Sequence, residues 1–368
     1  PPRLRTIVVR RIFLFFPLLI LAITACTSPG SLGGVDSPTS ILITDALGRQ
    51  VSLPAAPQRI VITGKALVMI ADAVYAFPEA PARIVGLGNA GQGTSNFIAL
   101  IDPDYPHKAV LENNAGAEQI AALQPDLVLL KSYLAESVGA PIETLGIPVI
   151  YVDFETPDQY SRDLAILGQV FQNEARAAEL IAYYQSQVDD VQQAVQDLIE
   201  KPRVLLLYYS DKDGSVAFNV PPLAWMQTQM VQMAGGEVAW ADANLSNGWT
   251  QVTLEQIAAW NADDIFIISY NTNASDVVAG LAADPNWQAL RAVQSGRLHA
   301  FPADLYSWDQ PDTRWSLGLT WLAGRLHPQL FPDLDMLAEA RSFYHTLYGL
   351  DQAFFEQYIL PTFKGDLP

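Results

Sequence analysis

The sequence predicts an α/β protein of two doubly wound lobes with mainly parallel sheets, joined by one long helix. Three observations predict this class. Short β-rich runs alternate with helical patterns over most of the chain, an uninterrupted helical pattern covers residues 173–199, and the pentapeptide Glu-Gln-Ile-Ala-Ala occurs once on each side of it. Strands that alternate with helices are typical of a parallel sheet covered on both faces.

Length and composition agree with two folded domains. The chain has 368 residues, and domains of roughly 100–200 residues each bury a substantial core. A hydrophobic content of 50% with 16% charged residues excludes a disordered chain. The net charge of −18 argues against nucleic-acid binding, which needs clustered Lys and Arg. A single cysteine allows no internal disulfide and no zinc site of the Cys-x-x-Cys kind.

The first lobe is expected over residues 41–157. β-rich apolar runs predict strands there, and apolar residues at helical spacing predict helices between them. The predicted strands are 59–63, 84–87, 127–130 and 149–152, and the helices include 66–76 and 118–123.

A long helix is predicted over residues 173–199, within a linker region of helices at 158–200. Asn173 is a suitable N-cap, and Lys201-Pro202 ends the pattern. A helix of 27 residues is about 40 Å long, enough to run between two lobes. An ordinary long surface helix within one domain is the alternative. Its apolar positions recur at spacings of three and four: Ala177, Leu180, Ile181, Tyr184, Val188, Val191, Val195 and Leu198.

The second lobe is expected over residues 201–368, where the alternation resumes. Strands are predicted at 204–209, 265–269 and 298–301, and helices at 225–234, 254–260 and 313–326. The shared pentapeptide begins at Glu118 in the first half and at Glu255 in the second, each time on a helix that leads into a strand after an Asp. This predicts a weak internal repeat of two similar lobes.

The N-terminal segment has the pattern of an export signal. Basic residues are followed by 14 uncharged residues from Ile12 to Ala25, too few for a bilayer span of about 20 residues but typical of a signal peptide. The run ends in Ile23-Thr24-Ala25-Cys26, which resembles the lipobox of bacterial lipoproteins. We therefore predict a signal peptide over 1–26, lipidation of Cys26, a flexible Gly/Pro/Ser-rich tether over 27–40, and a folded body outside the cytoplasm. The alternative is a free buried cysteine near the end of an uncleaved anchor helix.

The body resembles a known family over about residues 41–345. The resemblance is carried by Ile43 to Val51 (ITDALGRQV), Pro57 to Val61 (PQRIV), Glu118 to Leu129 (EQIAALQPDLVL), Leu145 to Val149 (LGIPV), the long helix, and Trp308 to Leu326 followed by His327-Pro328. In this order, these segments are similar to the substrate-binding lipoproteins of ABC importers for ferric siderophores, cobalamin and heme.

This resemblance implies a ligand cleft between two lobes that one rigid helix joins. It implies a membrane-anchored, monomeric binding protein that delivers a ferric siderophore to an ABC permease and its ATPase. It implies no catalysis and no cofactor, the ligand itself being a ferric chelate. Cobalamin, heme or another metal chelate is the alternative ligand. An extracytoplasmic hydrolase on the same architecture and a receptor-docking sensor are alternatives of other classes.

Two carboxylates are predicted to dock onto the permease. In the family a Glu exposed on each lobe contacts permease arginines, and Glu118 and Glu255 occupy the repeat positions that fit this role. Carboxylate–Arg pairs give oriented, bidentate contacts. The alternative is a Glu that only favours the helix dipole.

Aromatic residues in loops at strand ends are expected to line the ligand cleft. All eight Trp lie between positions 225 and 321, so the second lobe is the aromatic one. Trp315 and Trp321 stand at helical spacing and are expected in the core, and Trp260 and Trp287 are also interpreted as structural. The predicted ligand contacts are Tyr133, Tyr208, Trp225, Trp249, Tyr270 and Trp308, which offer rings for stacking on a macrocycle or chelate.

Three cations stand at predicted cleft positions of this acidic chain. Lys65, Lys131 and Arg314 are expected to favour an anionic ligand such as a ferric catecholate or a heme carboxylate. Solvated surface charges are the alternative for each of them.

Other motifs are assigned no chemistry. Gly86-x-Gly88-x-x-Gly91 matches the dinucleotide fingerprint but lacks the following helix, and we interpret it as a cleft loop. His107, His299, His327 and His345 are scattered without ligand spacing, so no bare metal site is predicted. His327 is expected at a helix end. No nucleophile motif or acid pair stands out, so no catalytic residue is assigned.

Overall fold

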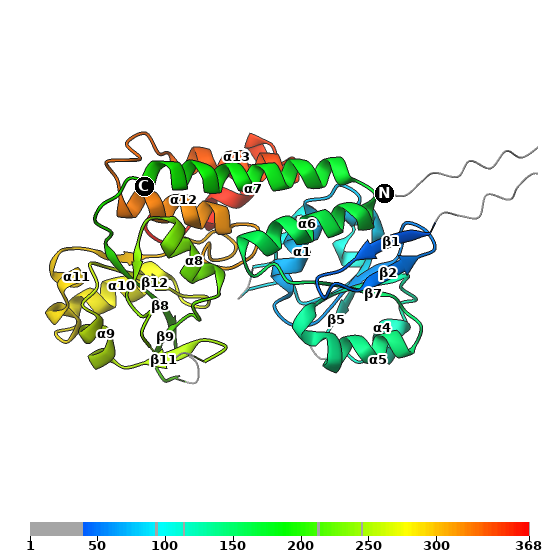
Figure 1. Cartoon of the computed structure of the whole chain (residues 1–368), viewed down its shortest axis with the longest axis horizontal. Helices are drawn as coiled ribbons and strands as arrows, with labels where there is room; N and C mark the ends of the chain where they lie inside the picture. The colour runs from blue at the N-terminus through cyan, green and yellow to red at the C-terminus, as the bar shows by residue number, and fades with distance from the viewer. Residues whose placement is uncertain (1–39, 93–94, 113–114, 212–213, 244–245, 368) are drawn as a thin grey trace, which may run out of the picture. The chain divides into compact units, whose positions relative to one another are not determined.

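The computed structural model describes residues 40–92, 95–112, 115–211, 214–243 and 246–367 (Figure 1). The predicted signal peptide, Cys26 and nearly all of the tether lie outside these residues. Within the described ranges, no helix combines the length and the apolar character that crossing a membrane requires.

The first half of the described body holds a parallel sheet in the order β5-β4-β3-β6-β7. An antiparallel hairpin of β1 (Ile41–Thr44) and β2 (Gln50–Leu53) precedes it. The strands of the sheet are β3 (Ile60–Ile62), β4 (Ile84–Gly88), β5 (Ala109–Leu111), β6 (Leu127–Lys131) and β7 (Val149–Val152). The helices between them are α1 (Leu67–Tyr75), α2 (Ala80–Arg83), α3 (Phe97–Ile101), α4 (Ala117–Ala121) and α5 (Ala140–Thr144).

Two helices follow this sheet and pack against each other: α6 (Pro157–Phe171) and α7 (Glu174–Val195). The side chain of Asn173 accepts a hydrogen bond from the N–H of Arg176, so it caps α7 as predicted. The helix has 22 residues, about 33 Å, and ends earlier than predicted. Ile199 is 98% exposed, so burial does not stabilise the last predicted turn.

The second half holds a mixed sheet in the order β11-β9-β8-β12-β13, with β10 also paired to β8. Strands β8, β10, β12 and β13 are parallel, whereas β9 and β11 are antiparallel additions that the sequence analysis did not identify. The strands are β8 (Arg203–Ser210), β9 (Ala217–Val220), β10 (Glu237–Val238), β11 (Thr250–Val252), β12 (Asp264–Ile268) and β13 (Leu298–Ala300).

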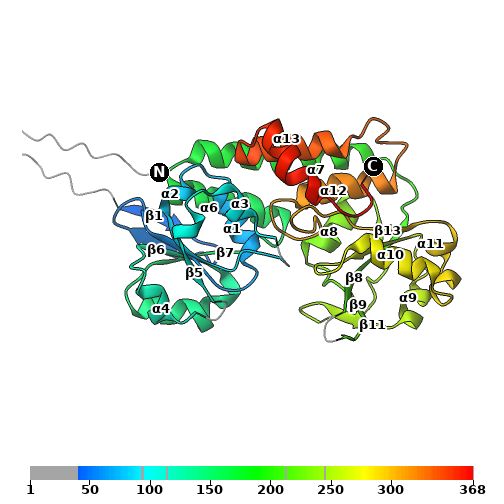
Figure 2. The same cartoon turned by 180° about the vertical axis from the view of Figure 1, so that it is seen from behind.

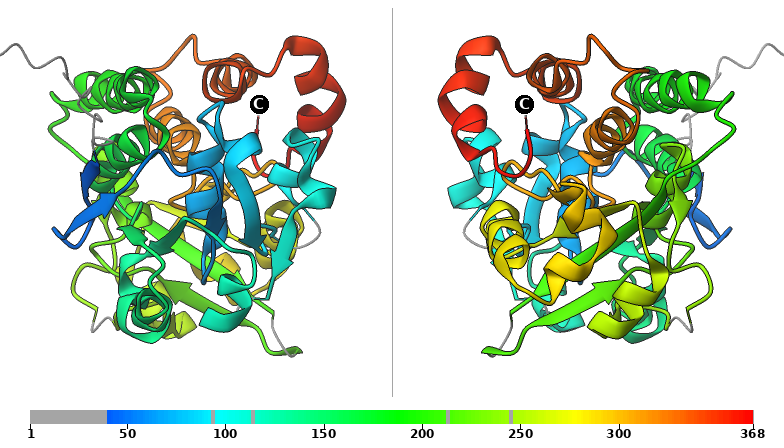
Figure 3. Two further views of the ribbon diagram at one scale, coloured as in Figure 1. Left: turned by 90° about the vertical axis from the view of Figure 1, so that its right-hand side faces the viewer. Right: turned by 90° about the vertical axis from the view of Figure 1, so that its left-hand side faces the viewer.

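The remaining helices belong to the second half. Helix α12 is buried along nearly its whole length and packs against α7, α8 and α13, and Figures 1 and 2 show α7, α12 and α13 running alongside one another. The end-on views of Figure 3 show helices on both sides of the strands. These helices are α8 (Met226–Met233), α9 (Leu254–Trp260), α10 (Ala274–Ala283), α11 (Arg291–Gln294), α12 (Trp315–Leu326), α13 (Met336–Tyr348) and α14 (Gln352–Phe354). Short 3-10 or π turns lie at 105–107, 132–139, 287–289 and 355–362.

The predicted repeat corresponds to equivalent places in the two sheets. Helix α4 leads into β6, which lies between β3 and β7, and α9 leads into β12, which lies between β8 and β13. Strands β3, β6 and β7 are parallel, and so are β8, β12 and β13. The two halves therefore share a three-strand parallel core, and the α/β fold class is confirmed.

The segment 301–314, between β13 and α12, connects the two halves. The hydroxyl of Tyr306 donates to the carbonyl of Ala90 at 2.6 Å and accepts from the N–H of Phe97 at 2.8 Å. The hydroxyls of Tyr160 and Tyr184 donate to carbonyls of the same segment at 3.1 and 2.8 Å. A largely buried loop of the second half thus contacts the first sheet region and both linker helices.

Candidate functional site

A pocket of about 500 Å³ lies where loops of the two halves meet. It is within the usual size range of small-molecule sites, roughly 300–1,000 Å³. Its lining residues come from both halves: Ala66, Met69, Tyr133 and Glu155 from the first, and Trp225, Gln227, Asn247, Trp249, Tyr270, Gln310 and Pro311 from the second.

The topology of the two sheets explains this position. In parallel sheets the carboxyl ends of the strands share one edge, and the loops that follow them line ligand sites. Loops after β3, β6 and β7 supply the first half of the lining, and loops after β12 and β13 supply part of the second. The cleft predicted between the lobes therefore corresponds to a pocket in the structure.

Aromatic rings form one wall of this pocket. The rings of Trp225 and Trp249 meet edge to face, with centroids 5.7 Å apart. Tyr208 stacks on Tyr270 at 4.7 Å and contacts Trp249 at 5.0 Å, so it supports two lining rings from behind. Such ring contacts fix the orientation of the faces that remain open.

Four of the predicted ligand contacts line the pocket: Tyr133, Trp225, Trp249 and Tyr270. Tyr133 is 58% exposed, so much of its ring is open to solvent. Lys65 is exposed and precedes the lining residue Ala66. The structure thus places these residues together or close by, while their contact with a ligand remains a prediction.

Lys131 is fully buried behind the pocket. Its ammonium lies 2.5 Å from a carboxylate oxygen of Glu155 and 3.2 Å from the sulfur of Met69, and it also donates to the carbonyl of Asp153. Burial lowers the pKa of the Lys131 ammonium, and the charge of Glu155 opposes that change. The cation is thus paired with a carboxylate that lines the pocket.

Arg314 does not lie in the cleft, contrary to prediction. Its side chain is fully buried, with nitrogens 2.6 Å from Asp72, 2.7 Å from Asp304 and 3.6 Å from Asp312. Its guanidinium also lies over the rings of Phe97 and Tyr306. The charge joins α1 of the first half to the 301–314 segment, and the buried carboxylates take the place of the predicted anionic ligand.

One guanidinium cannot neutralise three buried carboxylates. Burial raises the pKa of Asp72 to about 6 and raises that of Asp312 as well, although Arg314 acts in the opposite direction on both. The interface between the halves therefore contains carboxyl groups that take up protons more readily than exposed ones.

The prediction that Trp308 contacts the ligand in the cleft is also wrong. Its ring is fully buried, its Nε1–H donates to Asp304 at 3.0 Å, and it packs edge to face on Phe363. It is part of the core, like Trp315 and Trp321, which are buried as predicted. A loop position alone did not distinguish a buried ring from an open one.

Asp309 connects several residues of the pocket. One of its oxygens accepts from the hydroxyl of Tyr270 at 2.8 Å and from Nε2 of Gln227 at 3.2 Å, and the other accepts from the hydroxyl of Ser307 at 2.6 Å. Burial raises the pKa of Asp309 to about 6, while these hydrogen bonds lower it. The carboxylate thus holds two lining side chains in place.

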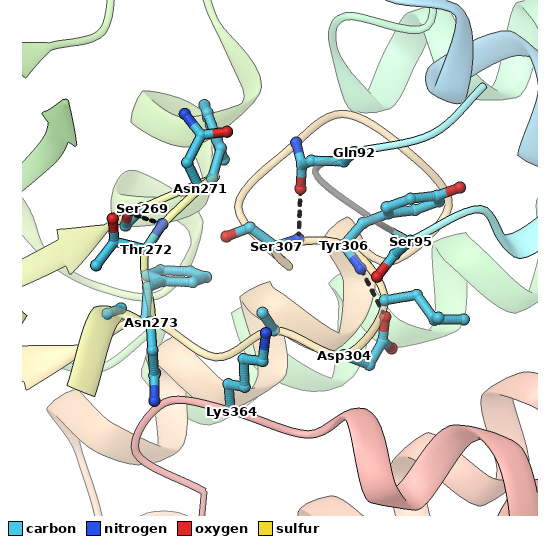
Figure 4. Close-up of a pocket in the computed structure, with 15 residues that line it drawn as sticks. Gln92, Ser95, Ser269, Asn271, Thr272, Asn273, Asp304, Tyr306, Ser307 and Lys364 are labelled. Carbon is cyan, nitrogen blue, oxygen red and sulfur yellow. Dashed lines mark hydrogen bonds between the residues drawn. The ribbon is translucent and has the colours of Figure 1, made fainter. Parts of the chain in front are cut away.

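A second, smaller pocket shares Tyr270 with the first and is also lined by Ser307 (Figure 4). Gln92 and Ser95 face the 304–307 loop across it, and Oε1 of Gln92 accepts from the N–H of Ser307 at 3.3 Å. Its volume of about 170 Å³ is too small for a chelate, since drug-sized ligands occupy roughly 300 Å³ or more. The other polar liners are Ser269, Asn271, Thr272, Asn273, Asp304 and Lys364.

The glycine motif is a loop only in part: Gly86 and Gly88 belong to strand β4, whereas Gly91 lies in the loop that follows it. A Cβ at Gly86 would lie 2.6 Å from Leu123, and one at Gly91 would lie 2.8 Å from the carbonyl of Ser95. Close packing therefore accounts for these glycines without a dinucleotide. The scattered histidines agree with their interpretation in one respect: His327 is the C-cap of α12. Within the described ranges, no group of His, Cys, Asp and Glu is placed to hold a metal ion.

Glu118 and Glu255 occupy the first turns of α4 and α9, and both side chains are exposed. Figures 1 and 2 place both helices on the side of the body away from α7, α12 and α13. The pKa of Glu255 is lowered by hydrogen bonds from backbone N–H and from Thr253, as expected for a helix start. The geometry is compatible with both the docking role and the dipole role.

The sequence did not identify Met69, Glu155 and Gln227 as residues of the site. Asp309 and Gln310 were not singled out either, although they lie in a loop after a strand, where the cleft lining was expected. The only signal was the density of polar residues between Asp304 and Arg314, next to a strongly apolar helix. The partners of that segment lie far away along the chain, so the pattern could not assign them.

Comparison with known proteins identifies relatives of the whole body. The family model described as periplasmic binding protein matches residues 83–305. The molybdate-binding protein MolA of Haemophilus influenzae is 24% identical over 83% of this chain and 90% of its own length. The vitamin B12-binding protein of Pectobacterium atrosepticum is 26% identical over 59% of this chain and 79% of its own.

Two further matches extend the comparison. The iron-uptake system-binding protein of Bacillus subtilis is 22% identical over 62% of this chain and 69% of its own length. A crystal structure of a periplasmic solute binding protein from Veillonella parvula superposes with a TM-score of 0.70, at 25% identity, over 88% of this chain and 97% of that one.

Proposed function

The chain belongs to the periplasmic binding protein family and is the extracytoplasmic solute-binding component of an ABC importer, and we propose that it binds an organic metal chelate. The first candidate for this chelate is a ferric siderophore. Proteins of this family bind a solute and pass it to a permease and its ATPase without transforming it.

The aromatic pocket is the observation that carries this proposal. Trp225, Trp249, Tyr270 and Tyr133 present rings around about 500 Å³ of space between the two halves. Rings of this kind bind the organic body of a chelate by stacking and apolar contact. The relative named as an iron-uptake system-binding protein supports the choice of iron.

A small oxyanion fits this lining less well. The molybdate-binding relative is named for such a solute. A tetrahedral oxyanion needs cations or several N–H donors around it. Among the lining residues that the structure describes, the charged one is Glu155, a carboxylate. Cobalamin is the second candidate, because vitamin B12-binding proteins are among the relatives.

The delivery of the solute is proposed to use both lobes and a lipid anchor. Glu118 and Glu255 would contact the permease, one from each half, and a lipidated Cys26 would hold a monomeric binding protein at the membrane surface. The exposed positions of both Glu residues support the first part. Metabolic labelling with a radioactive fatty acid, with Cys26→Ala as the control, tests the second.

A tryptophan-fluorescence titration of residues 27–368 tests the proposed solute. The panel contains ferric hydroxamates, ferric catecholates, heme, cobalamin and molybdate, with metal-free chelators as controls. We expect saturable quenching by a ferric chelate at micromolar or tighter affinity, because Trp225 and Trp249 line the pocket. Saturable binding of cobalamin or molybdate alone would overturn the iron assignment, and transport of the same solute in cells would separate an importer component from a sensor.

A further inference from the structure

We infer that Lys131 is a positioning residue, which holds two strained loops in the shape of the pocket wall before a solute arrives. This inference rests on the proposed function, because it takes the aromatic pocket as the solute site. It assigns the charge of Lys131 to the protein itself rather than to the binding of an anionic ligand.

Two residues beside the pocket have a left-handed backbone conformation, which residues other than Gly rarely adopt. Ala66, which lines the pocket, has a φ of 54°, and Phe154, which precedes the lining residue Glu155, has a φ of 55°. Ala66 lies between β3 and α1, and Phe154 lies directly after β7 and Asp153. Such a conformation costs free energy, so it persists only where surrounding contacts impose it.

Other left-handed residues lie at helix ends instead. In the described part of the chain, three more residues besides glycines have a positive φ: Gln124, Gln172 and Asn261. Gln172 and Asn261 are the C-caps of α6 and α9, where a left-handed residue is common, and Gln124 follows the end of α4. None of these three lines the pocket, so the strain at Ala66 and Phe154 needs a different explanation.

The ammonium of Lys131 contacts both strained loops. It lies 3.2 Å from the sulfur of Met69, which stands in the first turn of α1. On the other loop it donates to the carbonyl of Asp153 and pairs with Glu155 at 2.5 Å, so it contacts both neighbours of Phe154. Because the side chain of Lys131 is fully buried, these contacts are shielded from solvent and fix the two loops relative to each other.

The whole first-half lining of the pocket depends on this one side chain. Met69 and Glu155 touch the ammonium, Tyr133 lies two positions after Lys131 in the chain, and Ala66 immediately precedes α1. Without the ammonium, the strained loops can relax to conformations of lower free energy. The apparent affinity for a solute then falls with the fraction of molecules whose wall keeps the binding shape.

Ala66 is the position at which the strain itself can be tested. Phe154 is also held from α6, because Oδ2 of Asp163 accepts from the N–H groups of Asp153 and Phe154 at 2.6 and 2.8 Å. Its buried ring packs edge to face on Tyr160 and cannot be removed without loss of core contacts. Ala66 is exposed and carries a single methyl group, so Gly in its place removes the strain and little else.

Hydrogen exchange on the ligand-free protein tests the positioning role without any solute. Lys131→Met should accelerate exchange of the backbone amides at 69–71 and 153–155 by about ten-fold. Met69→Leu keeps the side-chain volume and removes only the contact to α1, so it should accelerate exchange at 69–71 alone. Lys108→Met, which replaces a second buried and paired lysine of the first half, should affect neither loop. Unchanged exchange at both loops in Lys131→Met would overturn the inference.

Solute affinity tests whether Lys131 acts through the strained backbone, with the ferric chelates, heme and cobalamin of the titration above as probes. For each probe that binds the wild type, Lys131→Met should weaken binding by about ten-fold. Addition of Ala66→Gly should recover at least about three-fold of this loss, because Gly adopts the left-handed conformation without strain. Gln172→Gly relieves the same strain at an exposed helix end outside the pocket lining and should recover nothing.

The outcomes separate this inference from the proposed function. Equal affinities of Lys131→Met and of Lys131→Met/Ala66→Gly would show that Lys131 does not act through the strained loop, and would overturn the inference while the proposed function stands. Saturable binding of no probe to the wild type would overturn the proposed function. The exchange measurements would still decide whether Lys131 holds the two loops.

Discussion

Asp309 illustrates how a single buried residue shapes the pocket without lining it. Its carboxylate accepts hydrogen bonds from the hydroxyl of Tyr270 and the amide of Gln227. The carboxylate is buried away from solvent, which raises its pKa. Buried carboxylates are costly, so three hydrogen-bond donors surround this one. The buried carboxylate lowers the stability of the folded protein at neutral pH, but it fixes the orientation of two side chains in the pocket wall.

Because of Asp309, the free energy of unfolding should depend on pH. Because the pKa of folded Asp309 is raised to about 6 from an ordinary 3.8, the folded state binds the proton more tightly than the unfolded state. This group's contribution to stability therefore falls as pH rises from about 4 to 6, by up to about 3 kcal/mol. Asp309→Asn should remove that fall. Urea unfolding at pH 4 and pH 7 measures it, and the exposed Asp242→Asn serves as control; equal pH dependence of wild type and Asp309→Asn would contradict the prediction.

At the scale of elements, α12 shows how tightly the second half is packed. The helix is buried on nearly all sides, and its Gly318 passes directly over the 301–314 segment. A Cβ at this position would lie 2.2 Å from the carbonyl oxygen of Trp308. The backbone of the segment that positions Asp309 and Arg314 therefore depends on this glycine.

Gly318→Ala should destabilise the protein by about 1–3 kcal/mol or more, because backbone must move to admit the methyl group. Gly280→Ala is the matched control: Gly280 lies within α10, a Cβ added there would meet nothing within 4 Å, and its φ is ordinary. Here Ala should stabilise by about 0.5–1 kcal/mol, since Gly is a poor helix former. Urea unfolding measures the free energy of unfolding of each variant relative to wild type. Similar changes in this free energy for both variants would contradict the packing argument.

The helices α4 and α9 carry the two carboxylates assigned to the permease. If Glu118 and Glu255 serve docking, the double variant Glu118→Ala/Glu255→Ala should lower solute uptake by cells at least ten-fold and leave solute affinity unchanged. Exposed carboxylates elsewhere, Glu136 and Glu356, provide the matched double control. A dipole role alone predicts the opposite pattern, with normal uptake and a slightly less stable protein.

At the scale of the whole molecule, a buried ion cluster connects the two halves. Arg314 pairs with Asp72 of α1 and with Asp304 and Asp312 of its own segment, and tyrosine hydroxyls from α6 and α7 reach the same segment. A ligand that binds across both halves therefore meets lobes whose relative position is already constrained. Small adjustments of loops such as 131–135, rather than large lobe rotations, are the expected response.

Removal of the shared cation should loosen this connection. Arg314→Met leaves buried carboxylates unpaired and should cost about 3–5 kcal/mol at pH 7.5. The loss should shrink near pH 4.5, because the raised pKa values of Asp72 and Asp312 allow both to take up protons. Arg291→Met breaks an exposed pair with Asp263 and should cost no more than about 1 kcal/mol. If both variants lost the same free energy of unfolding in urea, the burial of the Arg314 cluster would not explain its contribution to stability.

Local patterns predicted most of the regular structure. The strand 149–152 and the helix 254–260 have their predicted bounds, because a continuous apolar run and a capped amphipathic run each depend on nearby residues alone. Strands β9 and β11 were missed, since strands of three or four residues that include polar side chains carry little pattern. Helix α13, which packs on α12, was also missed despite its amphipathic pattern.

By itself, the sequence determined the α/β class, the long helix and the repeat, and through its motifs it indicated the family. These features follow from the spacing of apolar residues and from short sequence motifs. Only the tertiary structure decided which polar side chains meet. Arg314 and Asp72 are 242 positions apart, and Asp309 and Gln227 are 82 apart, yet each pair is in hydrogen-bond contact. Whether a charge faces a ligand or a buried partner depends on such distant contacts, and for this reason the sequence wrongly placed Arg314 in the cleft.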